Sequence, residues 1–236
     1  MKDDPIVIVG SARTPMGAFM GDLKTLTAPE LGAFAIRAAV ERAGVGPQDV
    51  QEVIMGNVLP AGQGQAPARQ AALGAGLPPA AGCMTINKVC GSGMKAAMLA
   101  HDMLALGVND VMVAGGMESM SNAPYLLPKA RAGLRLGHGE VKDHMFLDGL
   151  EDAYDRGRLM GTFAEDCADK YRFSREAQDR YAITSLKRAQ AAIHDGGFER
   201  EIVPVTLGGK TGALVKTDEQ PQIGRASCRE RVCQYV

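Results

Sequence analysis

The feature that most constrains this chain is the regular alternation, over its first 118 residues, of short apolar runs with segments of helical periodicity. The apolar runs predict strands over residues 6–9, 53–59, 85–89 and 111–114. Apolar residues at helical spacing predict helices over residues 28–43, 66–73 and 93–106. Because short Gly- and Pro-containing connections separate these segments, the pattern favours a layered α/β domain with a mainly parallel sheet.

Composition narrows the class of protein. The 236 residues carry 26 basic and 27 acidic side chains, a net charge of −1, so no global field attracts nucleic acid or an anionic membrane. The first residues contain no apolar stretch of the signal-peptide kind. We therefore expect a soluble, cytoplasmic protein without nucleic-acid or membrane partners.

The five cysteines are irregularly spaced, and no C-x-x-C occurs among them. An odd number at such spacing is not typical of a disulfide framework, and the four histidines lie far from any cysteine pair. We therefore expect no metal site. One cysteine needs a chemical explanation.

That cysteine is Cys90, which follows the predicted strand 85–89 and precedes a Gly-Ser-Gly turn and a helix. The helix is apolar nearly all round, so we expect it to be buried in the middle of the domain. Its N-terminal N–H groups and dipole would then favour the thiolate, the nucleophilic form of a cysteine. The backbone N–H of Cys90 could donate to an oxyanion. Considered alone, the residue could equally be a small buried hydrophobe.

Four motifs, in order, resemble the thiolases, the acetyl-CoA C-acyltransferases, and they span Ile6 to about Pro221. They are VIVGSARTPMGAFMGDL, INKVCGSGMKA, VMVAGGMESMSNAPY, and DGLEDAY with LMGTFAED followed by SREAQDRYA. The resemblance implies that Cys90 is the nucleophile acylated by acyl-CoA. It implies that Met160 lies beside the acyl and pantetheine pocket and that Lys210 approaches CoA. Acyl-CoA thioesters are then substrates, and no cofactor is implied.

The resemblance also implies a division of the chain. Residues 1–118 match an incomplete N-terminal core domain of the layered α-β-α kind, with a mixed, mainly parallel sheet. Residues 119–222 match an inserted α+β loop domain that binds CoA and assembles dimers or tetramers. We expect His138 and His144 to be exposed histidines in or near that loop, and Cys167 to be a packed helix residue. The segment 223–236 has no strand or helix period and resembles a translated sequencing adapter, so we expect a non-native tail. The alternative is a genuine flexible terminus.

Thiolases carry further catalytic motifs that this chain lacks: a G-H-P histidine, a C-x-G cysteine and an N-E-A-F asparagine. We therefore expect a truncated and inactive form that lacks the second core domain and leaves an apolar face exposed. Three hypotheses stay open. The chain derives from an acetyl-CoA acetyltransferase, from a broader-chain 3-ketoacyl-CoA thiolase or ketoacyl synthase, or it is a non-catalytic protein that binds CoA or a partner.

Overall fold

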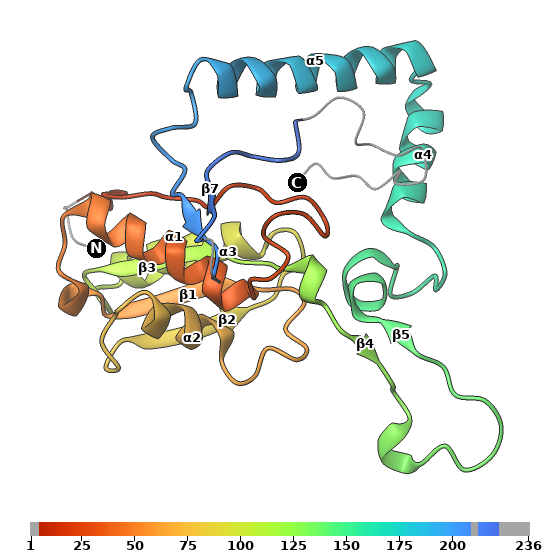
Figure 1. The fold of residues 1–236 in the computed structure, drawn as a ribbon, viewed down its shortest axis with the longest axis horizontal. Coiled ribbons are helices and arrows are strands. Elements are labelled where there is room, and N and C mark those ends of the chain that lie inside the picture. The colour runs from red at the N-terminus through yellow and green to blue at the C-terminus, as the bar shows by residue number, and fades with distance from the viewer. Residues whose placement is uncertain (1–4, 209–211, 222–236) are drawn as a thin grey trace.

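A computed structural model describes residues 5–208 and 212–221. Three parallel strands form its central sheet, in the order β2–β1–β3 (Figure 1). They are β1 (Glu52–Gly56), β2 (Gly82–Ile86) and β3 (Met112–Gly116). Gly56 is level with Ile86 and Gly116 across the sheet, so the three strands end together. In open sheets of parallel strands, ligands bind outside this carboxyl edge.

Helices cover both faces of the sheet, as the alternation predicts. On one face lie α1 (Ala28–Ala43) and α2 (Pro67–Gly74), which pack on Val53 and Met55 of β1. Side chains alternate along a strand, so the buried Ile54 points to the opposite face, where α3 (Ser92–Ala105) lies. The layered α/β architecture with a parallel sheet that the sequence predicts is therefore present.

The ends of α1 show why this sequence forms a helix here. Thr27 accepts a hydrogen bond from the Glu30 N–H, and the Glu30 carboxylate accepts one from the Thr27 N–H. This reciprocal capping box satisfies two donors that a helix start leaves without intrahelical partners. Pro29 occupies the first turn, and Gly44 ends the helix in the left-handed conformation.

Beyond β3 the described chain forms little β-sheet. Two short antiparallel pairs, β4 with β5 and β6 with β7, are its only sheets within the described residues. The helix α5 (Arg175–His194) begins after Ser174, whose side chain accepts a hydrogen bond from the Ala177 N–H. In Figure 1, α4 and α5 stand away from the central sheet, and neither helix has a buried residue. The remaining elements are η1 (Pro47–Asp49), η2 (Met120–Asn122), β4 (Tyr125–Leu126), η3 (Ala130–Ala132), β5 (Lys142–Asp143), η4 (Phe146–Leu150), α4 (Met160–Tyr171), α5 (Arg175–His194), β6 (Val205–Thr206) and β7 (Leu214–Val215).

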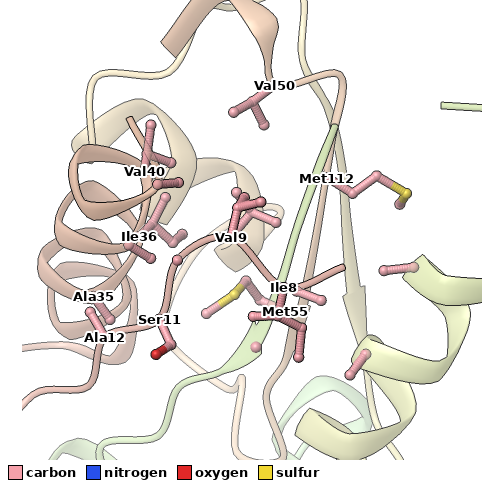
Figure 2. A pocket seen from close by; sticks show the side chains of 18 of the residues that line it. Ile8, Val9, Ser11, Ala12, Ala35, Ile36, Val40, Val50, Met55 and Met112 are labelled. Carbon is pink, nitrogen blue, oxygen red and sulfur yellow. The ribbon is translucent and has the colours of Figure 1, made fainter. Parts of the chain in front are cut away.

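The strand predicted over Ile6–Val9 is absent. This segment runs as irregular chain along an apolar cavity of about 700 Å³ that also touches α1 and β3 (Figure 2). The Ile8 side chain is 91% exposed. Within the described residues β3 pairs only with β1, so Ile6–Val9 has no strand partner. A β-branched run favours a strand only where it can pair and pack, which explains the difference.

The expected tail, 223–236, lies outside the described residues. In the described part of the chain, no helix combines the length and the apolar character that crossing a bilayer requires.

Candidate active site

Cys90 lies on a tight turn between the end of β2 and the start of α3. Two backbone hydrogen bonds close the turn. The Gly91 N–H donates to the Lys88 carbonyl, and the Ser92 N–H donates to the Val89 carbonyl. Val89, directly before the cysteine, has φ +48°, which is unusual for a β-branched residue. A conformation of this kind persists only where surrounding contacts hold it, and such residues cluster at functional sites.

Two side chains hold this turn. Ser92, which is buried, donates its hydroxyl to the Val89 carbonyl at 2.6 Å and accepts from the Lys88 N–H at 2.8 Å. Asn87 accepts from the Val89 N–H at 2.8 Å. The strained residue is therefore fixed through both its N–H and its carbonyl.

The start of α3 lies against the sheet because the facing residues are glycines. A Cβ added to Gly56 would lie 2.6 Å from the Ser92 Cβ and 2.9 Å from the Gly93 nitrogen. A Cβ on Gly116 would lie 3.5 Å from the Gly93 Cα. The N-terminus of α3 is thus set directly on the carboxyl ends of β1 and β3, where a sheet of this kind offers a binding edge.

The Cys90 residue is exposed and its thiol is free. It lies two residues before the first residue of α3, whose first N–H groups have no acceptor within the helix and carry the positive end of its dipole. Gly91, the next residue, has no side chain that could block the approach of a carbonyl carbon to the sulfur. This arrangement fits a nucleophile, and it excludes the alternative that Cys90 is a buried hydrophobe.

A carboxylate at the same sheet edge organises the neighbouring loop. Glu118, two residues after β3, accepts from the Val58 N–H at 2.8 Å and the Leu59 N–H at 3.1 Å. It also accepts from the side-chain amide of Asn57 at 2.8 Å. Burial raises the pKa of Glu118 above its ordinary value, against the opposing effect of these hydrogen bonds. The sequence analysis missed this residue, although it stands in the motif GGMESMS.

Comparison with known proteins identifies the family. A family model described as "Thiolase, N-terminal domain" matches residues 6–227. The chain belongs to the thiolase family. Over 218 residues it is 56% identical to Acetyl-CoA acetyltransferase 2 of Arabidopsis thaliana, covering 91% of this chain and 54% of that protein. It is 53% identical to the Acetyl-CoA acetyltransferase of Cupriavidus necator, covering 91% and 55%, and 50% identical to that of Schizosaccharomyces pombe, covering 94% and 57%. The chain therefore spans about half the length of these relatives.

Two further site residues are expected from the thiolase resemblance, and Met160, the one that the structure describes, begins a helix that stands away from α3 (Figure 1). Met160 is the first residue of α4 and is 42% exposed. Lys210 lies outside the described residues.

Two expectations about the thiolase helices are wrong. The helix α3 is not buried all round: only Ser92, Ala96 and Ala100 are buried, and Met94 is 74% exposed. The reason is that the described residues cover only the face of α3 that meets β1 and β3. Cys167 is exposed on α4 rather than packed, because no element among the described residues covers that helix.

The expectation for the two loop histidines is half right. His138 is exposed, but His144 is only 4% exposed. His144 Nδ1 lies 2.6 Å from an Asp148 carboxylate oxygen, and Nε2 accepts from the Ala61 N–H at 3.4 Å. These contacts use both ring nitrogens, so His144 joins the η4 segment to the loop after β1. Among the described residues, no cluster of His, Cys, Asp or Glu side chains has the grouping of a metal site.

Proposed function

We propose that this chain carries the acyl-cysteine half of an acetyl-CoA acetyltransferase, the enzyme that forms or thiolyses acetoacetyl-CoA. The observation that carries the proposal is an exposed, free Cys90 on a fixed turn at the start of α3. Relatives named acetyl-CoA acetyltransferase, at 50–56% identity, support acetyl-CoA as the substrate. A longer-chain 3-ketoacyl-CoA specificity is the alternative within the family.

In the proposed step the Cys90 sulfur attacks the thioester carbonyl of acetyl-CoA. The C–S bond to CoA breaks, a C–S bond to Cys90 forms, and CoA leaves as a thiol with the proton from Cys90. The oxyanion formed during the attack needs donors, and the backbone N–H groups at the start of α3 are suited to this. The acyl group is then ready for the carbanion of a second acetyl-CoA, or for transfer back to CoA.

The chain contains no G-H-P, C-x-G or N-E-A-F motif, so it offers no counterpart of the family's acid/base groups. Loss of one general acid/base group costs on the order of 100- to 10,000-fold in rate. We propose that this chain can be acylated but turns over at least about 100-fold more slowly than an intact thiolase. In the same proposal, residues 119–222 provide the loop domain that holds CoA and assembles oligomers. There Met160 and Lys210 contact the pantetheine arm and CoA.

The site of action is proposed to be the cytoplasm. A relative from Gibberella zeae, 50% identical, carries the word cytosolic in its name. Another from Bos taurus, also 50% identical, is named mitochondrial.

The test is acylation of the purified chain by acetyl-CoA, followed by peptide mass spectrometry and assay of released CoA. We expect an acetyl group on Cys90, CoA release that stops near one equivalent, and no acylation in Cys90→Ala. Cys167→Ala, which removes another exposed thiol, should leave acylation unchanged. Bound CoA without acylation would show a non-catalytic binding protein, and turnover at intact-thiolase rates would contradict the proposed inactivity. Acylation by longer acyl-CoAs but not acetyl-CoA would support the alternative specificity.

A further inference from the structure

We propose that Glu118 is a positioning residue for Cys90, acting through a relay of hydrogen bonds that runs by way of Val58 and Asn87 to the turn beside the thiol. The inference rests on the proposed function only in giving Cys90 a chemical role. Glu118 itself touches neither the thiol nor, in this proposal, the substrate.

The relay begins at the Glu118 carboxylate. One oxygen accepts from the Asn57 side chain and the Leu59 N–H, and the other accepts from the Val58 N–H. Three donors from consecutive residues therefore converge on one carboxylate. A glutamine amide in its place would turn an N–H group toward one of these donors. Only a carboxylate can therefore accept hydrogen bonds from all three. Hydrogen bonds to a charged group are also stronger than neutral ones.

The loop held in this way contacts the turn of Cys90. The Val58 carbonyl accepts from the Asn87 side-chain amide at 3.4 Å. The carbonyl oxygen of the same Asn87 side chain accepts from the Val89 N–H at 2.8 Å. Asn87 thus joins the Glu118-bound loop to the residue with positive φ that directly precedes Cys90.

A second connection runs through the backbone. The Asn57 N–H donates to the Ile86 carbonyl at 3.0 Å, which ties the loop after β1 to the last residue of β2. Glu118 therefore acts on both ends of the segment 86–89.

The experiment measures the rate at which iodoacetamide alkylates each cysteine, resolved by peptide mass spectrometry. The ratio of the Cys90 rate to the Cys167 rate is the readout, because Cys167 is an exposed thiol on α4 that the relay does not reach. In Glu118→Gln we expect this ratio to fall about three- to tenfold, the range that loss of one hydrogen bond predicts. Glu41→Gln, an exposed acid on α1, is near neither thiol in sequence and should leave the ratio at the wild-type value.

A second variant keeps the proposal testable if Glu118→Gln does not fold. Asn87 is exposed, so Asn87→Ala should fold, and we expect the same fall in the ratio. If both residues act through one relay, the double variant should show no larger fall than the stronger single variant. Multiplied effects in the double variant would overturn the relay. A lowered melting temperature in Glu118→Gln with an unchanged ratio would overturn it too, because Glu118 would then be merely structural.

These outcomes are separable from failure of the proposed function. Alkylation needs no CoA, so a wild-type chain that is not acylated by acetyl-CoA would refute the proposed acyl transfer and leave the ratio experiment valid. A wild-type chain that is acylated, combined with unchanged ratios in both variants, would refute the positioning role alone.

Discussion

Arg13 and Asp218, 205 residues apart in sequence, form a two-point ion pair. Arg13 Nη1 lies 2.7 Å and Nη2 lies 2.9 Å from the two Asp218 carboxylate oxygens. The same carboxylate accepts from the Met16 N–H, and the neighbouring Glu219 accepts from the Ala18 and Asp22 N–H groups. The loop after the N-terminal segment is therefore tied to the far end of the described chain.

This pair predicts how stability depends on pH. Burial by itself raises the pKa of Asp218, but the hydrogen bonds from Arg13 and Met16 outweigh it and hold the folded-state pKa below its ordinary value. A carboxyl with a lowered pKa contributes stability above its ordinary pKa and loses it as the pH falls through the folded value. Asp218→Asn should therefore cost about 1.5–3 kcal/mol at neutral pH and progressively less in acid.

The measurement is the free energy of unfolding in urea at a series of pH values, for wild type and Asp218→Asn. The difference between the two curves should close below the ordinary aspartate pKa. Asp169→Asn, an exposed acid on α4, is the matched control and should follow wild type throughout. A difference that stays constant into strong acid would rule out the ion pair as its source.

Gly56→Ala tests the close approach of α3 to the sheet. The added Cβ would meet the Ser92 Cβ at 2.6 Å, and backbone atoms of α3 cannot yield cheaply. We expect a loss of about 1–3 kcal/mol in stability and slower alkylation of Cys90, because the helix start must shift. Gly208→Ala, where an added Cβ meets nothing within 4 Å, should change neither. Unchanged stability and alkylation in Gly56→Ala would show that the approach tolerates a methyl group.

Periodicity alone predicted the central elements of the fold. The helices α1, α2 and α3 begin within a residue of their predicted starts, because capping and apolar spacing are local signals. The strand ends were less accurate. The predicted strand 85–89 ends at Ile86 as β2, since Asn87 and Val89 use their polar groups within the turn that presents Cys90.

What the sequence could not predict depends on contacts between distant segments. The Ile6–Val9 run has strand propensity, but pairing decides whether it forms a strand, and no local pattern encodes that. The motif around Cys90 was found because strand, turn and helix are consecutive. Glu118 was missed, and His144 was wrongly expected to be exposed, because their partners, Val58 and Ala61, lie 60 and 83 residues away.

Removing the N-cap of α1 and removing the N-cap of α5 should have different effects on global stability. Thr27→Ala removes half of the capping box of α1, whose face is buried against α2, so we expect global stability to fall by about 1 kcal/mol. Ser174→Ala removes the cap of α5, which has no buried residue. Its loss should increase hydrogen exchange in the first turn of α5 and leave the global free energy of unfolding unchanged. Equal global losses in the two variants would show that α5 unfolds together with the core.

The exposed face of α3 predicts self-association. Met94 and Met98 are one turn apart, at 74% and 51% exposure, and with Val89 they form an apolar strip beside Cys90. Exposed apolar patches are surfaces for association. The double variant Met94→Gln/Met98→Gln should lower the association constant measured by sedimentation and the binding of a hydrophobic dye. Its free energy of unfolding should change by less than about 0.5 kcal/mol, since neither side chain belongs to the core. Met20→Gln, an exposed methionine outside this strip, is the control and should leave association unchanged. If the double variant associates as strongly as wild type, the contact between copies lies on another surface, and α4 and α5 become the segments to substitute next.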